Sequence, residues 1–298
     1  MAKFGNREMR GVIPPMVTPF KQNGDLDKKA LREVVSFLKK RVHGLFVNGT
    51  YGCGPLMSVN ERKDVLEIVT EEAGNDIQVC VHIGSTSNRD AIDLGKHAAK
   101  LNVVGVASVP PYYFPHKTVD IENYFIELIN EIDAPVYLYN NPITTSFAAS
   151  ADFLSGLAEK GLKGVKDSSF DILVFYDYLR NIKKEKFHFI MGSEALILPA
   201  VVMGGRASIA GMANCLPEEV VALWEAAESS EIEEASELQK RVLSIRDIYK
   251  SGSTTPLVYK TLRERGINAG YPRKPFRDQP NEVWQKVKTK LKNLGVVL

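Results

Sequence analysis

A lysine that ends a short apolar run is the first residue whose position suggests chemistry. The run Leu162–Lys166 reads Leu-Lys-Gly-Val-Lys and is followed by Asp-Ser-Ser. In a strand, alternation puts Gly164 and Lys166 on one face and Val165 on the other, so Lys166 faces an interior if Val165 packs against helices. Burial lowers the pKa of a lysine and exposes a neutral amine, which attacks a carbonyl to form a Schiff base. The alternation alone also allows an ordinary surface lysine.

A tyrosine stands near the end of a second apolar run, Pro135–Asn140, which continues into Asn-Pro. The aliphatic residues of this run fit an outward face, whereas Tyr137 and Tyr139 fit an inward one. A phenol at the top of a strand that neighbours Lys166 can shuttle a proton in acid–base catalysis. The alternative is a core aromatic side chain whose hydroxyl is satisfied by a hydrogen bond.

The third candidate is a glycine-rich turn, Asn48–Pro55, which reads Asn-Gly-Thr-Tyr-Gly-Cys-Gly-Pro. Glycines let backbone N–H groups converge on an anion such as a carboxylate or phosphate. The turn lacks the third glycine of a dinucleotide fingerprint and the Gly-Lys-Ser/Thr of a nucleotide-binding P-loop. An ordinary tight turn between a strand and a helix is the alternative. Together, the three stretches describe a site for a small anionic carbonyl compound.

Eight apolar runs that alternate with amphipathic stretches must position these residues. Such alternation indicates a parallel sheet, and eight strands favour a closed (β/α)8 TIM barrel over an open doubly wound sheet. The active site of a barrel lies at the carboxyl ends of its strands, where all three candidates fall. The predicted strands are Gly11–Thr18, Gly44–Asn48, Ile77–Ile83, Val103–Val109, Pro135–Asn140, Leu162–Lys166, Phe187–Met191 and Ala207–Ala210.

The predicted helices between the strands include one whose start is marked by a capping box, Ser58 followed by Glu61. After residue 215 the strand pattern stops. We therefore expect a barrel over residues 1–215 and a helical extension over 216–298 that packs on it. The predicted helices are Lys28–Lys40, Val59–Glu72, Asp90–Lys100, Ile121–Ile132, Leu196–Met203, Pro217–Ser229, Ile232–Ser251, Thr255–Gly266 and Asn281–Leu294, with an irregular segment at Tyr271–Pro280.

The composition argues against several classes of protein. The 298 residues carry 38 Lys+Arg and 36 Asp+Glu, and this near balance disfavours a nucleic-acid binder with a broad basic surface. No apolar run reaches the roughly 18 residues of a membrane span, and the polar stretch Met1–Arg10 lacks the apolar core of a secretory signal. Three dispersed cysteines favour a reducing cytoplasm over a disulfide framework. The five histidines have no metal-ligand spacing, which disfavours a metal-dependent enzyme.

The three stretches resemble motifs of the pyruvate-dependent class I aldolase superfamily, which includes dihydrodipicolinate synthase, N-acetylneuraminate lyase and 2-keto-3-deoxygluconate aldolase. The motifs are Gly49–Gly52, Tyr139–Pro142 and Gly164–Asp167, and the likeness runs from Pro14–Phe20 to Tyr271–Pro275. The resemblance implies a class I lyase that uses pyruvate and an aldehyde. It also implies a homotetramer built as a dimer of dimers, and no cofactor besides the covalent imine.

The resemblance assigns a role to each matching residue. The family's Schiff-base lysine falls on Lys166, its proton-relay tyrosine on Tyr139 and the relay threonine on Thr50. The backbone N–H groups of Thr50 and Tyr51 match the cradle for the pyruvate carboxylate. Tyr113 matches a tyrosine that the family lends to the site of a neighbouring subunit.

The substrate is predicted from departures within these motifs. Thr144 stands where dihydrodipicolinate synthases carry an arginine for the semialdehyde carboxylate, and Cys53 replaces the glutamate of a synthase motif. His116 and Asn141 stand where relatives that accept phosphorylated sugar acids carry arginine and tyrosine. The segments Gly52–Pro55, Pro111–Pro115, Val165–Ser168 and Tyr271–Arg273 are similar to archaeal-type 2-keto-3-deoxygluconate aldolases.

We therefore expect reversible cleavage of a 2-keto-3-deoxy sugar acid to pyruvate and a hydroxyaldehyde. Side-chain hydroxyls and one carboxylate, Glu194, suit a polyol chain because they exchange hydrogen bonds with sugar hydroxyls. A 4-hydroxy-tetrahydrodipicolinate synthase is the alternative if an arginine such as Arg206 reaches the site, and a non-catalytic ligand-binding relative is a remote one. The expected substrate-binding residues are Thr50, Tyr51, Thr144, Ser168, Ser193 and Ser208, with Thr145 nearby.

Overall fold

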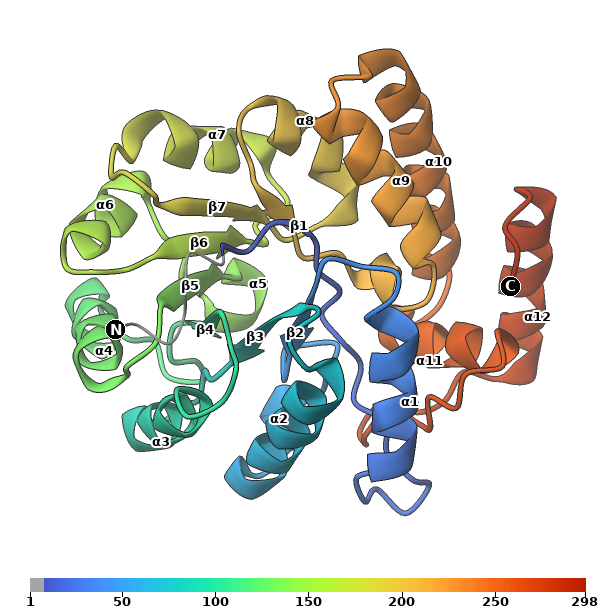
Figure 1. Ribbon diagram of the computed structural model, residues 1–298, viewed down its shortest axis with the longest axis horizontal. Helices are drawn as coiled ribbons and strands as arrows, with labels where there is room; N and C mark the ends of the chain where they lie inside the picture. The colour runs from blue at the N-terminus through green and yellow to red at the C-terminus, as the bar shows by residue number, and fades with distance from the viewer. Residues whose placement is uncertain (1–7) are drawn as a thin grey trace.

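Eight parallel strands form the centre of the protein in the computed structural model, which describes residues 8–298 (Figure 1). Strands that follow one another in sequence are neighbours in the sheet, in the order β1-β8-β7-β6-β5-β4-β3-β2. Backbone hydrogen bonds from His43 N to Val12 O (3.0 Å) and from Met16 N to Phe46 O (2.9 Å) join the two ends of this order. The predicted (β/α)8 barrel is thus confirmed. The strands are β1 (Gly11–Val12), β2 (Gly44–Val47), β3 (Gln78–His82), β4 (Gly105–Ser108), β5 (Val136–Asn140), β6 (Gly164–Asp167), β7 (His188–Met191) and β8 (Ala207–Ser208).

Helices surround the strands as a ring (Figure 1). The predicted capping box is present at the start of α2, where Glu61 N donates to Ser58 Oγ and Ser58 N donates to the Glu61 carboxylate. The helices that alternate with the strands are α1 (Lys28–Leu38), α2 (Val59–Ala73), α3 (Asn88–Ala98), α4 (Thr118–Glu131), α6 (Ala151–Glu159), α7 (Ile172–Asn181), α8 (Ile197–Val202) and α9 (Pro217–Glu228), with the short α5 (Pro142–Thr145) after β5.

Every strand is shorter than the sequence pattern predicts, and the first and the last are reduced to two residues each. The first was expected over Gly11–Thr18 but is limited to Gly11–Val12 plus a single bridge from Pro15 to Phe46. Pro14 and Pro15 lack the N–H groups that a continuous ladder needs, which explains the interruption. The last predicted strand, Ala207–Ala210, ends at Ser208, although Ala210 N still donates to a backbone carbonyl of the first strand segment.

Alternation along the strands separates an inner core from an outer one. Tyr137 and Tyr139 belong to the buried cluster inside the barrel, whereas Val136 and Leu138 pack in the cluster between strands and helices. Val165 also lies in the outer cluster. The predicted inward direction of both tyrosines is confirmed. Because Val165 faces the helices, the next residue on β6, Lys166, faces the interior.

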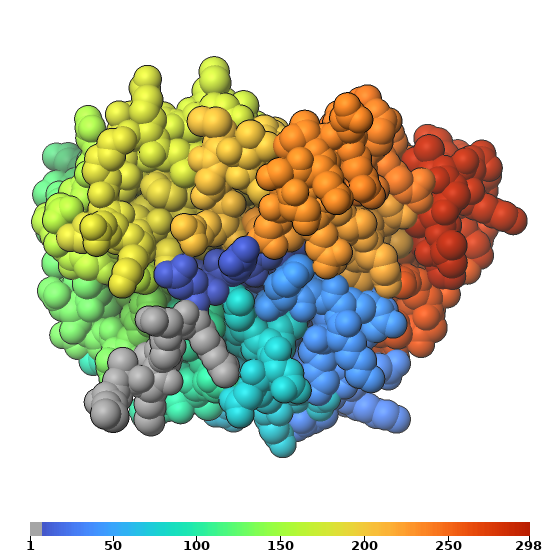
Figure 2. All heavy atoms as spheres, turned by 45° about the horizontal axis from the view of Figure 1, so that its top comes forward, coloured from blue at the N-terminus to red at the C-terminus, as the bar shows by residue number. Residues whose placement is uncertain are grey.

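The helices beyond the barrel gather at one end of the molecule, where they are orange to red in Figure 2. They are α10 (Ile232–Lys250), α11 (Thr254–Glu264) and α12 (Asn281–Asn293). The helix α9 contacts α8 and β1 and completes the alternation of strand and helix. The sequence analysis, which divided the chain at residue 215, assigned this helix to the extension. Across residues 8–298, no helix is long and apolar enough to cross a membrane. Residues 1–7, most of the N-terminal stretch considered above, lie outside the described residues.

Candidate active site

The lysine and the tyrosine predicted from the strand ends lie side by side in the barrel mouth. Tyr139 on β5 and Lys166 on β6 are partners in the parallel register. The Lys166 amine lies 3.3 Å from the centre of the Tyr139 ring and 4.8 Å from that of Phe46. Beneath Lys166, a side chain at Gly164 would put its Cβ 2.4 Å from the carbonyl oxygen of His188, so only glycine fits there.

Burial shifts the protonation of this pair. Lys166 is only 4% exposed, and burial lowers its pKa because the ammonium form loses its hydration, although the neighbouring Tyr139 opposes the shift. Burial alone would raise the pKa of the Tyr139 phenol. The charge of Lys166 and hydrogen bonds from Lys166, Thr50 and Ser168 outweigh burial, and the net direction is downward. A lysine with a lowered pKa beside an acidified phenol is suited to nucleophilic attack assisted by proton transfer.

A second layer of hydrogen bonds fixes the two strand ends that carry these groups. Asn140 Nδ2 donates to Asp167 Oδ1 at 2.7 Å and lies 3.1 Å from the Tyr178 hydroxyl, and Ser169 Oγ donates to Asp167 Oδ2 at 2.7 Å. Asn140 and Asp167 immediately follow Tyr139 and Lys166. The bond between Asn140 and Asp167 therefore fixes the position of Tyr139 relative to Lys166 along the two strands.

The glycine-rich turn after β2 brings Thr50 next to Tyr139 in the barrel mouth. Among residues 8–298, the backbone N–H groups from Gly49 to Gly52 donate no hydrogen bond, whereas those of Cys53 and Gly54 do; of the four, Thr50 and Tyr51 line the cavity. A Cβ at Gly54 would lie within bonding distance of the Asn48 carbonyl oxygen, so the tight turn requires glycine. Thr50 Oγ1 is 3.5 Å from the Tyr139 hydroxyl, which also accepts from Asn141 Nδ2 at 3.3 Å. The turn thus offers two free donors and a hydroxyl beside the phenol.

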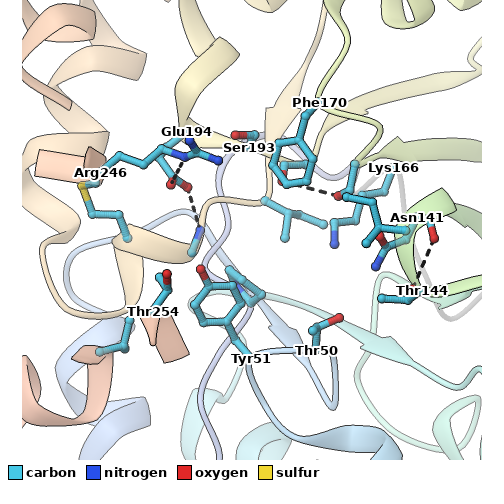
Figure 3. Close-up of a pocket in the computed structure, with 18 of the residues that line it drawn as sticks. Thr50, Tyr51, Asn141, Thr144, Lys166, Phe170, Ser193, Glu194, Arg246 and Thr254 are labelled. Carbon is cyan, nitrogen blue, oxygen red and sulfur yellow. Dashed lines mark hydrogen bonds and ion pairs between the residues drawn. The ribbon is translucent and has the colours of Figure 1, made fainter. Parts of the chain in front are cut away.

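These groups line one cavity of about 280 Å³ (Figure 3). Lys166 and Thr50 lie on one side of it in this view, and Glu194 with Arg246 lies on the other. Thr145 is buried outside the lining and donates to the Asn141 carbonyl oxygen. The predicted residues that the structure brings to the cavity are Thr50, Tyr51, Tyr139, Thr144, Lys166, Ser168 and Ser193.

Ser208, Tyr113 and Arg206 do not line this cavity. Ser208 pairs in register with Val12 and Met191, whose side chains pack outside the barrel, so the serine faces the helices. Arg206 precedes β8 at the opposite end of the barrel. Tyr113 is 86% exposed on the loop after β4, which leaves its predicted role in a neighbouring subunit as a prediction.

The main group that sequence reasoning missed is the arginine on α10. Arg246 lines the cavity, and its Nε lies 3.4 Å from Glu194 Oε1. Glu194 Oε2 also accepts the Gly211 N–H at 3.0 Å. Phe170, on the loop after β6, faces the same guanidinium at 5.6 Å. The sequence around Arg246 gives no indication of a role in the site, because an arginine on a long helix is typical of an ordinary surface position.

Within the part of the chain that the structure describes, no group of three or more His, Cys, Asp and Glu side chains could hold a metal ion. The three cysteines, Cys53, Cys80 and Cys215, are buried free thiols, and they lie far apart in the sequence.

The fold and this site define a class of protein, the carbon–carbon lyases built on a (β/α)8 barrel. Comparison with known proteins supplies the family. Residues 8–294 match the Dihydrodipicolinate synthetase family. The chain belongs to this family, whose members are lyases that use pyruvate together with an aldehyde or a sugar acid.

Relatives with three different activities are similar to this chain over nearly its whole length. The 4-hydroxy-tetrahydrodipicolinate synthase of Archaeoglobus fulgidus is 30% identical over 288 residues, which cover 96% of this chain and 99% of that protein. The N-acetylneuraminate lyase of Clostridium perfringens is 28% identical over 286 residues, covering 94% and 98%. A variant of the 2-keto-3-deoxygluconate aldolase of Sulfolobus solfataricus superposes with a TM-score of 0.88 at 30% identity, over 96% of each chain. The choice of substrate therefore has to be argued from the pocket.

Proposed function

We propose that this protein cleaves a 2-keto-3-deoxy sugar acid reversibly to pyruvate and a hydroxyaldehyde, through a Schiff base on Lys166. The observation that carries the proposal is the buried Lys166 amine 3.3 Å from the Tyr139 ring, with two unused backbone N–H groups in the same cavity. The amine attacks the keto carbon, and the free N–H groups of Thr50 and Tyr51 bind the adjacent carboxylate.

The later steps use the Lys166 amine and the Tyr139 hydroxyl. Attack by Lys166 and loss of water give an iminium ion, which accepts the electron pair when the C3–C4 bond breaks. Tyr139 takes the proton from the C4 hydroxyl as the aldehyde forms and returns a proton to C3 of the enamine. Hydrolysis of the imine then releases pyruvate and the free amine. The electron sink is the iminium itself, so we propose that the reaction needs no cofactor or metal.

The sugar-acid substrate is supported by the polar lining of the cavity. Hydroxyls of Thr144, Ser168 and Ser193 and the Glu194 carboxylate can exchange hydrogen bonds with the hydroxyls of a polyol chain. A substrate without hydroxyls would leave such groups unpaired, at a cost in transition-state binding. Thr144 donates to the Asn141 carbonyl oxygen at 3.2 Å, and no arginine lies beside it in the cavity lining within the described chain.

A second candidate is 4-hydroxy-tetrahydrodipicolinate synthase, which condenses pyruvate with aspartate semialdehyde. Arg246 favours it, because an arginine in the cavity is a partner for the second carboxylate. The comparison of kcat/KM for pyruvate with D-glyceraldehyde and pyruvate with aspartate semialdehyde separates the two. A tenfold preference for the semialdehyde, about 1.4 kcal/mol of transition-state discrimination, would replace the aldolase by the synthase.

Borohydride trapping tests the Schiff base. With pyruvate present, we expect the wild type to gain the mass of a reduced pyruvyl adduct on Lys166 and Lys166→Ala to gain none. Full trapping in the variant, or an adduct on Lys163, would refute the assignment. Absence of trapping in the wild type would favour a non-catalytic binder. Loss of activity in EDTA that zinc restores would contradict an iminium mechanism without metal.

We also propose a homotetramer, built as a dimer of dimers, in a reducing cytoplasm. Tyr113 and Phe114 are exposed aromatic side chains, 86% and 62%, that a second copy of the chain would cover. The three buried free thiols suit a reducing compartment. Sedimentation equilibrium tests the assembly, with a fourfold mass expected for the wild type.

A further inference from the structure

We infer that the ion pair between Arg246 and Glu194 determines which aldehyde the cavity accepts, by cancelling the charge of an arginine that would otherwise bind an anionic tail. The inference rests on the proposed function and names the pair that sets its specificity. Figure 3 shows the pair on the side of the cavity away from Lys166. That is where the end of a substrate bound to Lys166 would lie.

The pair is fixed from both sides. Glu194 is held by the Gly211 N–H through the carboxylate oxygen that does not face Arg246. On the other element, Gln239 of α10 donates to the Glu194 carbonyl oxygen at 3.0 Å and accepts the Leu198 N–H at 3.1 Å. This buried side chain docks α10 against the segment after β7. The approach of Arg246 to Glu194 is therefore set by packing, not by a flexible surface contact.

The pair is also largely removed from water. The side chains of Glu194 and Arg246 are 10% and 23% exposed. Charges in such a place interact more strongly than charges on a surface. Any anion close enough to bind Arg246 also approaches Glu194, and the attraction and the repulsion offset each other.

The other cation of this wall also has an acidic partner, but that pair is exposed to water. Lys250 lies one turn after Arg246 on α10 and lines the cavity, and its amine is 3.1 Å from Asp247 Oδ1. Each of the two cations thus has an acidic partner, although Asp247 lies outside the cavity lining. A neutral polyol loses nothing there, whereas a second carboxylate gains no net electrostatic attraction.

Removing the charge of Glu194 should release Arg246. In Glu194→Gln, the amide oxygen can still accept the Gly211 N–H, so the local fold is kept while the carboxylate is lost. The guanidinium then presents a planar set of donors to a substrate carboxylate. We expect the variant to gain activity toward an aldehyde that ends in a carboxylate and to lose activity toward a polyol aldehyde.

The test compares succinic semialdehyde with D-glyceraldehyde, each with pyruvate. Glu194→Gln should raise the ratio of their kcat/KM values by at least tenfold over the wild type. The double variant Glu194→Gln with Arg246→Gln should return the ratio to within threefold of the wild type. An unchanged ratio in the single variant, or a gain that survives in the double variant, would overturn the inference.

The matched control is Asp247→Asn, which removes the same unit of charge from α10 without touching Glu194. Asp247 is 72% exposed, and exposed pairs contribute little. We expect a change in the ratio of less than threefold. A tenfold gain in this control would mean that net charge alone, not the release of Arg246, sets specificity.

Calorimetric binding of succinate separates this inference from the proposed function, because it requires no turnover. Glu194→Gln should bind succinate at least tenfold more tightly than the wild type, and the double variant should not. If pyruvate trapping fails in the wild type but succinate binding follows this pattern, the proposed reaction is wrong and the ion pair stands. If trapping succeeds and succinate binding is equal in all variants, the inference on the pair is wrong.

Discussion

The phenol of Tyr139 can be tested separately from its ring by Tyr139→Phe. The substitution keeps the ring beneath the Lys166 amine and removes only the hydroxyl, which accepts from Asn141 Nδ2 at 3.3 Å and lies 3.5 Å from Thr50 Oγ1. If the hydroxyl carries the proton to and from the substrate, the variant still binds pyruvate, but bond cleavage loses its acid and base.

The size of the effect follows from what a positioned proton carrier contributes. General acid–base catalysis is worth about 10²–10⁴-fold, which corresponds to about 3–5 kcal/mol of activation free energy. The described lining holds two other tyrosines: the Tyr249 hydroxyl is engaged by Thr261 at 2.6 Å, and Tyr51 belongs to the turn after β2, not to a strand next to Lys166. We therefore expect kcat to fall at least 100-fold.

The pH dependence supplies a second readout. Burial lowers the pKa of Lys166, and Tyr139 opposes that shift by its charge and hydrogen bond. Without the hydroxyl, only the weaker effects of Cys80 and Asp167 oppose burial, and the pKa of the amine falls further. The neutral amine then persists to lower pH, so the acid limb of the rate of imine formation should move to lower pH in the variant.

Steady-state cleavage and the rate of borohydride-trapped imine formation, each measured between pH 5 and 9, check both expectations. Tyr137→Phe is the matched control, because Tyr137 is also buried on β5 but bonds to His188 Nδ1 at 2.8 Å. It should cost stability and leave kcat within threefold of the wild type. If Tyr139→Phe also stays within threefold, or its acid limb does not move, the hydroxyl is structural and the reasoning fails.

Two further substitutions probe the turn after β2 and the floor beneath Lys166. Thr50→Val removes the hydroxyl 3.5 Å from Tyr139 and should lower kcat by less than Tyr139→Phe does, while a loss larger than that of Tyr139→Phe would make Thr50 the principal proton carrier. Gly164→Ala puts a Cβ against the His188 carbonyl and should lower the free energy of unfolding in urea by about 1–3 kcal/mol. Its control, Gly156→Ala, lies in α6 with open space around its Cβ position and should raise stability by about 0.5–1 kcal/mol; a neutral Gly164→Ala would show that β6 can shift.

The inward direction of the key side chains was predictable because a strand has a period of two. Once the aliphatic residues of β5 and β6 are assigned to the helix-facing side, Tyr139 and Lys166 have to face the interior. The start of α2 was predictable for a similar reason, since Ser58 and Glu61 satisfy each other's backbone N–H groups over four residues. Both signals are local, so no other part of the chain is needed to interpret them.

Contacts between distant elements could not be predicted in this way. Arg246 enters the cavity because Gln239 docks α10 on the segment after β7, and a helix pattern specifies neither the partner nor the angle of such packing. Ser208 was misplaced because β8 is two residues long, which is too short for alternation to indicate a face. The sequence by itself therefore determined the barrel and its lysine and tyrosine through short-range periodicity, whereas the charge balance at the far wall of the cavity was decided only by how helices outside the barrel pack.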